Sequence, residues 1–263
     1  MLRIPTSGDD KYSRGVVGVR TGSAEYPGAA VLGVEAAWRA GAGFVRYIGA
    51  GRAMDAVIAR RPETVAAPAI GRSRVDAWVI GSGTDASRRT AEDEHELRLI
   101  LSGTAPVVVD AGALDLAVGA TAPRILTPHG GEHARLRARI GLSEPGGDRA
   151  ADAAETAAAL DAVVLLKGAP TLVASPHGAI LRVDTAPHWL ATAGAGDVLA
   201  GVIGALAAAD PHALPAATAA GAAWLHGRAA ALAAGSAHGG AGHPIVAMDV
   251  AEALPAAIGE ILS

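Results

Sequence analysis

The chain of 263 residues has no cysteine, which excludes disulfides, thiolate metal sites and cysteine nucleophiles. This absence fits the reducing environment of the cytoplasm. Lysine is almost missing as well, since Lys11 and Lys167 are the only lysines beside many arginines. We attribute the arginine excess to the codon usage of a GC-rich genome and do not take it as evidence for phosphate binding. Lys167 is more informative, because it interrupts an apolar run.

Long apolar runs and an excess of positive charge are also missing. The longest apolar run, near 198–209, is shorter than the ~20 residues of a membrane span and is bracketed by Asp197 and Asp210. The first twelve residues are polar and lack the apolar core of a secretion signal. The net charge of −4 argues against nucleic acid or an anionic membrane as a partner. We therefore expect a soluble globular protein.

Short β-branched segments alternate with alanine-rich segments of helical spacing. Near-continuous apolar strands between helices predict a largely parallel sheet covered on both faces. A chain of this length and type is commonly one domain, so we predict a single α/β domain over residues 1–263. The expected strands are 16–19, 43–49, 77–81, 106–110, 124–127 and 162–167, followed by a hairpin of 171–175 and 179–184. The expected helices are 29–39, 86–101, 131–140, 149–160, 198–209, 214–234 and 249–262.

The strongest local signal is the segment LATAGAGDVLAG at 190–201. Gly194 and Gly196 allow the backbone to approach a ligand closely, and the start of the following helix attracts an anion such as a phosphoryl group. A carboxylate at such a place repels the anion unless it has a chemical role. Asp197 is suited to take a proton from a hydroxyl that attacks phosphorus. The alternative is a loop in which Asp197 only caps the helix.

Further candidates follow the carboxyl ends of the strands, where open α/β sheets bind ligands. The loop 81–83 offers glycines for a phosphate or a ring, or it is only a tight turn. Asp110 is placed to bind a ligand or a hydrated Mg²⁺, or to cap a helix. His129 is either a ligand contact or a structural histidine. The segment 167–171 combines a lysine and a threonine suited to a nucleotide, or it is a structural turn.

Two common phosphate-binding patterns are missing. The sequence has no P-loop, and no G-x-G-x-x-G stands in a first strand–helix turn. A nucleotide would therefore be held by separate loops. His226, His238 and His243 lack the spacing of a zinc site, so no metal is assigned to them.

Six segments, in this order and spacing, resemble the ADP- or ATP-dependent NAD(P)H-hydrate dehydratases of the ribokinase-like superfamily. They are TGSAEYPGA at 21–29, GAGFV at 41–45, PVVVDA at 106–111, LTPHGGE at 126–132, VLLKGAPT at 164–171 and ATAGAGDVLAG at 191–201. The resemblance covers nearly the whole chain. It implies a ribokinase-like, three-layer α/β/α fold with a mainly parallel central sheet.

The resemblance also implies a metabolite repair lyase. Enzymes of this family phosphorylate the added hydroxyl of NADH or NADPH hydrate and then eliminate phosphate, which restores the dinucleotide. ADP or ATP is the implied phosphoryl donor, Mg²⁺ the implied cofactor and a homotetramer the implied assembly. The implied catalytic residue is Asp197; the implied substrate contacts are Ala29, Gly83, His129 and Asp197; the implied nucleotide contacts are Lys167, Gly168, Ala169, Pro170, Thr171, Gly194 and Gly196.

The chain departs from the family pattern in three segments. It has SRG at 13–15, GSGTD at 81–85 and DAG at 110–112, where the family commonly has His-Lys-Gly, Gly-Pro-Gly-Leu-Gly and Asp-Ala-Asp. These departures bear on the substrate contacts near Gly83 and Asp110 more than on the reaction. Many family members also carry an N-terminal epimerase domain, for which we expect no room here. The chain would then act on one epimer, with a separate epimerase supplying it from the other.

Two other functions compete with the dehydratase. One is a ribokinase-like kinase for a vitamin precursor such as hydroxyethylthiazole, which would leave a stable phosphorylated product. The other is a nucleotide-binding sensor without catalysis, which the altered N-terminal segments favour.

Overall fold

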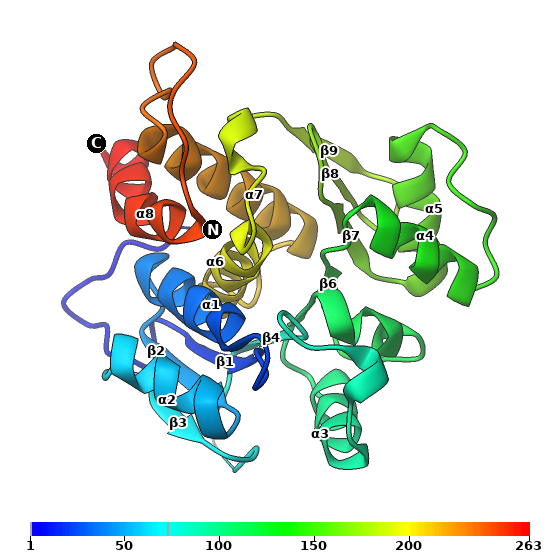
Figure 1. The fold of residues 1–263 in the computed structure, drawn as a ribbon, viewed down its shortest axis with the longest axis horizontal. Helices are drawn as coiled ribbons and strands as arrows, with labels where there is room; N and C mark the ends of the chain where they lie inside the picture. Colours follow the sequence, from blue (N-terminus) through cyan, green and yellow to red (C-terminus); the bar gives the residue numbers. More distant parts are fainter. Residues whose placement is uncertain (1, 73) are drawn as a thin grey trace.

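The computed structural model describes residues 2–72 and 74–263. In this part of the chain, nine strands form one sheet in the order β3-β2-β1-β4-β5-β6-β7-β8-β9 (Figure 1). Strands β1 to β7 pair in parallel, and β8 and β9 continue the sheet in antiparallel pairs. The strands are β1 (Val16–Arg20), β2 (Phe44–Ile48), β3 (Val65–Ala67), β4 (Ala77–Ile80), β5 (Val107–Val109), β6 (Arg124–Leu126), β7 (Val163–Leu166), β8 (Thr171–Ala174) and β9 (Ile180–Val183).

Helices cover both faces of the sheet, so the predicted three-layer α/β/α architecture is confirmed. They are α1 (Pro27–Arg39), α2 (Gly51–Arg60), α3 (Ala91–Leu101), α4 (Gly130–Arg139), α5 (Arg149–Leu160), α6 (Ala195–Ala209), α7 (Pro215–Ala233) and α8 (Ala247–Leu262). Short 3₁₀ helices lie at η1 (Ala86–Arg88), η2 (Ala111–Ala117) and η3 (His188–Leu190). Among the described helices, none combines the length and the apolar character that crossing a bilayer needs.

Successive residues of each buried strand enter opposite cores, as the pleat of a strand requires. In β5, Val108 packs with the core formed by α1, α6, α7 and α8, whereas Val107 and Val109 pack with the core formed by α3, α4, α5 and η2. Each of the three valines is at most 1% exposed. Burial on both faces explains why these strands are continuous apolar runs rather than alternating ones.

Several predicted element limits were wrong. The segment 86–101 is not one helix, because Asp85 and Thr90 each accept a backbone hydrogen bond and start separate elements, η1 and α3. Helix α2 and strand β3 were missed. Helix α6 begins at Ala195 and not at 198, since Gly194 adopts a left-handed backbone conformation with φ of 87° and forms its N-cap. Asp197 therefore lies inside the first turn of α6.

The order of the strands reverses between β1 and β4. The chain runs from β1 outward to β2 and β3, and then β4 pairs with the other side of β1. Such a reversal leaves a crevice at the carboxyl ends of the two strands, which is where open α/β sheets bind ligands. The loops after β1 and β4 are therefore the inner walls of the site described below.

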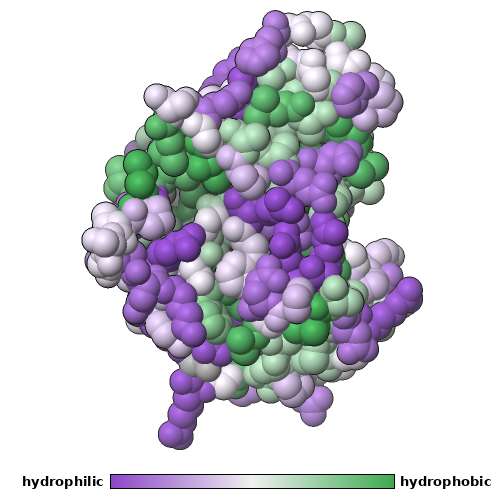
Figure 2. Space-filling model, turned by 90° about the vertical axis from the view of Figure 1, so that its left-hand side faces the viewer, coloured by the Kyte–Doolittle hydropathy of each residue, from purple (hydrophilic) through white to green (hydrophobic). Residues whose placement is uncertain are grey.

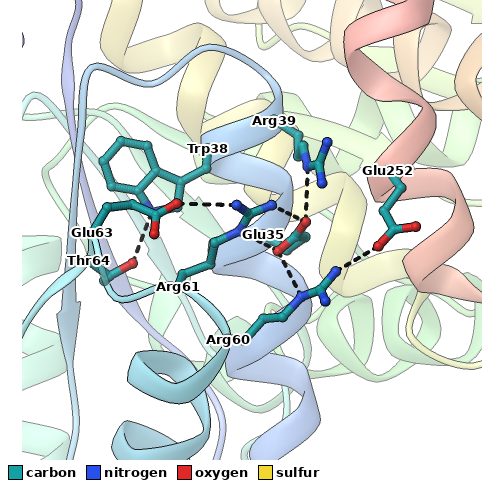
Figure 3. Close-up of polar contacts among 8 residues, drawn as sticks. All are labelled: Glu35, Trp38, Arg39, Arg60, Arg61, Glu63, Thr64 and Glu252. Carbon is teal, nitrogen blue, oxygen red and sulfur yellow. Dashed lines mark hydrogen bonds and ion pairs between the residues drawn. The ribbon is translucent and has the colours of Figure 1, made fainter.

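One buried carboxylate ties three helices together. Glu35 of α1 is fully buried and accepts hydrogen bonds from Arg39, Arg60 and Arg61, and Arg60 also pairs with Glu252 of α8 (Figure 3).

Figure 2 shows hydrophilic residues across the middle of the side that faces left in Figure 1, with apolar patches above and below. Polar residues thus divide the apolar surface of this side into separate patches.

Candidate functional site

The loops after β1 and β4 meet at the start of α1. The Gly22 N–H donates to the Ser82 carbonyl at 2.7 Å, which joins the two loops. Gly83 has a φ of +66°, and a Cβ built on it would lie 2.3 Å from the Cβ of Ala29. Only glycine fits there without displacing α1. Ala29 and Gly83, both predicted to contact the substrate, are therefore neighbours at the floor of the crevice.

Asp110, at the end of β5, is the centre of a buried polar cluster. One of its carboxylate oxygens accepts from Thr127 Oγ1 at 2.7 Å and from Lys167 Nζ at 2.8 Å. The other oxygen accepts from Ser82 Oγ at 2.7 Å. Asp110 is 2% exposed, and three donors from the loops after β4, β6 and β7 satisfy its carboxylate. Asp110 also occupies the N-cap position of η2, as the alternative prediction had it, but its side chain makes no cap hydrogen bond there.

His129 caps α4 and contacts the acid that follows it. Its Nδ1 accepts from the Gly131 N–H at 3.1 Å, while the His129 N–H donates to the Glu132 carboxylate at 2.9 Å. The same carboxylate lies 3.8 Å from Lys167 Nζ. The imidazole side chain is 56% exposed, so His129 combines a structural role with access to a ligand.

The first turn of α6 offers unpaired backbone donors. The first hydrogen bond of the regular helical pattern runs from the Val198 N–H to the Gly194 carbonyl, which leaves the N–H groups of Gly196 and Asp197 without an intrahelical acceptor. A Cβ built on Gly196 would lie 3.4 Å from Lys167 Nζ. A cationic side chain thus stands beside the positive end of a helix dipole, an arrangement that favours a phosphoryl group.

Asp197 is half-buried and makes no cap hydrogen bond to the helix. Burial raises the pKa of its carboxyl to about 6, the charge of Asp110 also acts to raise it, and Lys167 acts to lower it. The capping alternative is therefore wrong for this residue. A carboxylate with a pKa near neutrality, close to the backbone donors of a helix start, has the properties of a general base.

A pocket of about 330 Å³ opens beside this turn. Its walls include residues 167–171, Gly196 and the apolar side chains of Leu190 and Leu199. Arg149 holds one wall in place by donating to the carbonyls of Lys167 and Pro170. The predicted nucleotide contacts from Lys167 to Thr171 and Gly196 therefore share one cavity, whose lining combines polar and apolar residues as a nucleotide requires.

Two predicted residues lie just outside that cavity. Neither Gly194 nor Asp197 is among its lining residues, although both are within two positions of Gly196. Gly194 instead fixes the start of α6, where a Cβ would lie 2.5 Å from Leu32. Ala29 and Gly83 do not line the cavity either. Ala29 and Gly83 thus form the floor of the crevice, Asp110 and Lys167 form a charged centre, and residues 167–171 with Gly196 line the adjoining pocket.

His226 of α7 is a pocket residue that the sequence did not identify. The sequence showed only that its spacing from other histidines does not fit a zinc site. It lines the same cavity, is 5% exposed, and its Nε2 has no hydrogen-bond partner among the described residues. Burial lowers its pKa to about 4, against the opposing effect of a hydrogen bond with the backbone of Ala195. The only sequence signal for this pocket residue is a histidine inside an alanine-rich helix. The sequence does not show whether that histidine faces the pocket.

The described residues around the first turn of α6 do not form a metal site of their own. Within residues 2–72 and 74–263 there is no group of three or more side chains with metal-ligating geometry. Asp110, the predicted Mg²⁺ ligand, already binds Lys167 and two hydroxyls. Mg²⁺ typically takes one or two carboxylates together with substrate phosphates, so any such ion would depend on the nucleotide for most of its ligands.

Comparison with known proteins gives one consistent family. Residues 17–249 match the family model described as NAD(P)H-hydrate dehydratase. The chain is 45% identical over 227 residues to the bifunctional NAD(P)H-hydrate repair enzyme Nnr of Mycobacterium tuberculosis, over 82% of this chain and 45% of that protein. It therefore spans about half the length of this relative.

Other relatives match over more of their own length. The chain is 36% identical over 239 residues to the ADP-dependent (S)-NAD(P)H-hydrate dehydratase of Xanthomonas campestris, over 81% of this chain and 79% of the relative. The crystal structure of the ADP/ATP-dependent NAD(P)H-hydrate dehydratase of Bacillus subtilis, co-crystallised with ATP/Mg²⁺, superposes with a TM-score of 0.86 at 29% identity. That superposition covers 98% of this chain and 94% of the other.

Proposed function

Because this chain belongs to the NAD(P)H-hydrate dehydratase family, we propose that it restores NAD(P)H from its hydrate with ADP or ATP as phosphoryl donor. The observation that carries the proposal is the arrangement at α6. A carboxylate with a pKa near 6 stands in the same turn as the free N–H groups and next to Lys167. A sensor that only binds nucleotide has no use for a base at this place.

The proposed reaction has two steps. Asp197 accepts the proton of the added hydroxyl, whose oxygen attacks the terminal phosphorus of the nucleotide while the bond to the leaving nucleotide breaks. The N–H groups of Gly196 and Asp197 and the ammonium of Lys167 stabilise the charge on the transferring group. In the second step the carbon–oxygen bond breaks, phosphate leaves, and the adjacent carbon loses a proton to form the ring double bond.

The remaining predicted contacts fit this scheme. Ala29 and Gly83 present a small, flat floor on which a ring can lie, and His129 presents an exposed imidazole at the rim. Residues 167–171 and Gly196 would hold the nucleotide in the adjoining pocket. Mg²⁺ would accompany the phosphates of the nucleotide and neutralise part of their charge. A tetrameric assembly, a separate epimerase and a cytoplasmic location stay predictions.

The first experiment follows regeneration of NADH absorbance from NADH hydrate, with Mg²⁺ and either ADP or ATP. We expect regeneration by the wild type and a loss of at least ~10²-fold in kcat for Asp197→Asn, the usual contribution of a positioned base. Nucleotide binding by Asp197→Asn should persist. Asp55→Asn, an exposed acid on α2, is the matched control and should keep full activity.

Three results would count against the proposal. No regeneration with either nucleotide would remove the dehydratase function. A stable phosphorylated product without elimination would favour the kinase of a vitamin precursor. Equal activity in wild type and Asp197→Asn would remove Asp197 from the mechanism.

A further inference from the structure

A second cavity, of about 550 Å³, opens beside the charged centre and shares no lining residue with the nucleotide pocket. Its lining includes Ala111 and Gly112, which directly follow Asp110, and Glu132, whose carboxylate lies 3.8 Å from Lys167 Nζ. Tyr26 and Thr84 also line it and flank the crevice floor. The cavity therefore adjoins the place where the substrate ring is proposed to react.

Two exposed arginines of α4 also line this cavity. Arg135 and Arg139 are four residues apart, so they lie on the same side of the helix. Within the described chain, neither guanidinium has a hydrogen bond or an ion pair. A Cβ built on Gly131 would lie 3.7 Å from Arg135 Nη1, so Arg135 reaches back along the first turn of α4 toward the charged centre.

The acidic residues that line the same cavity already accept hydrogen bonds from the protein. Asp85 accepts from the Ser87 N–H at 2.9 Å, and Asp115 accepts from Arg89 at 2.6 Å. Glu132 accepts from the backbone N–H of the α4 N-cap. These acids have protein donors, whereas the two arginines have no protein acceptor among the described residues, so the cavity offers uncommitted positive charge to a ligand.

Arginines around the neighbouring cavity of about 930 Å³ differ in this respect. Arg20 is paired with Asp93 and Glu96, and Arg88 is paired with Glu25. Acidic side chains of the protein therefore already neutralise the charge of these arginines. Of the two cavities that share Tyr26 and Thr84 as lining residues, the smaller one therefore suits an anion better.

We propose that Arg135 and Arg139 bind the pyrophosphate of the dinucleotide substrate. Two guanidinium groups match the two phosphates in charge, and each can donate two parallel hydrogen bonds to phosphate oxygens. The proposal rests on the proposed function, because it takes NAD(P)H hydrate as the substrate. It assigns a recognition role to two arginines that the general arginine excess of the chain would otherwise hide.

The test compares Arg135→Gln, Arg139→Gln and the double variant with wild type. Arg52→Gln, an exposed arginine of α2 that lines neither this cavity nor the nucleotide pocket, is the matched control. For each single variant we expect KM to rise about ten-fold for both NADH hydrate and NADPH hydrate, the effect of losing a charged hydrogen-bonding partner. KM for the nucleotide and kcat should stay within about two-fold of wild type, since neither arginine lines the nucleotide pocket.

Binding of intact NADH, followed by its fluorescence, separates this inference from the proposed function because it needs no turnover. Weaker NADH binding by the double variant, with unchanged nucleotide binding and Tm, supports the pyrophosphate site even if the enzyme assay fails. Unchanged NADH binding, or none by wild type, would overturn it. A defect confined to NADPH hydrate would also overturn it, because the pair would then bind the 2′-phosphate.

Discussion

At the scale of single residues, the burial of Asp197, the proposed base, costs stability. Its carboxyl has a pKa of about 6 in the folded chain, mainly because of burial, against 3.8 for an ordinary aspartate. The unfolded chain therefore loses this proton at lower pH than the folded chain. The contribution of Asp197 to the free energy of unfolding is therefore fully present below about pH 4, where the carboxyl is neutral in both states. This contribution is lost progressively as the pH rises to about 6.

Asp197→Asn should consequently stabilise the protein at neutral pH although it lowers kcat. The difference between the two pKa values corresponds to about 1–3 kcal/mol in the free energy of unfolding, after allowance for partial exposure. The difference in stability between variant and wild type should be small at pH 4, grow up to pH 6 and then stay constant. Urea unfolding across this pH range measures it; a wild type as stable as the variant at pH 7 would contradict a carboxylate destabilised by burial.

The chemical identity of the site residues was predictable from local sequence, but their partners were not. Lys167 drew attention because a lysine is rare in this chain and interrupts an apolar strand end. Its ion pair with Asp110 spans 57 positions in sequence, and no local pattern encodes such a pair. The roles of the predicted site residues stay predictions, although the structure brings Ala29 next to Gly83 and Lys167 next to Gly196.

At the scale of elements, α6 is set by its glycines. Gly194 starts the helix in a left-handed conformation, and Gly201 permits close packing of α6 on α1, where a Cβ would lie 2.3 Å from the Gly33 carbonyl. This contact places the first turn of α6 beside the helix that carries Ala29. The sequence predicted the helix but started it three residues late, since an apolar run alone does not reveal where the first turn begins.

Gly201→Ala should therefore destabilise the fold by about 1–3 kcal/mol, because α1 must move to admit the methyl group. Gly259→Ala in α8 is the matched control, as a Cβ at this position would meet no atom within 4 Å. That change should stabilise by about 0.5–1 kcal/mol through helix propensity. Chemical unfolding distinguishes the two; a neutral Gly201→Ala would mean that the helices do not approach this closely.

At the scale of the whole molecule, Glu35 and its arginines connect regions that are remote in sequence. Burial acts to raise the pKa of Glu35, but hydrogen bonds from Arg61 and Arg39 and the nearby charges hold it below its ordinary value. Arg60 extends the cluster to Glu252, 192 positions away (Figure 3). The cluster thereby fixes α8 against α1 and α2 on the side of the sheet that bears α6.

Glu35→Gln should cost about 3–5 kcal/mol in unfolding free energy, because it leaves three arginines around a neutral centre. Glu252→Gln removes an exposed partner of the same cluster and should cost less than about 1 kcal/mol. Equilibrium unfolding at pH 7 compares them. Equal, small effects of both substitutions would show that the buried carboxylate does not hold these helices together.

The sequence by itself determined the three-layer class, the strands and helices with strong periodicity, the family and the residues that are predicted to bear the chemistry. These features depend on hydrophobic period, on glycine positions and on short ordered motifs, all of which are local. Only the tertiary structure decided which strands are neighbours, which charges are paired and which two arginines of α4 have no partner among the described residues. Those properties depend on the distances between residues that are far apart in the chain. These distances, which the fold sets, determine both the burial of a side chain and its electrostatic interactions.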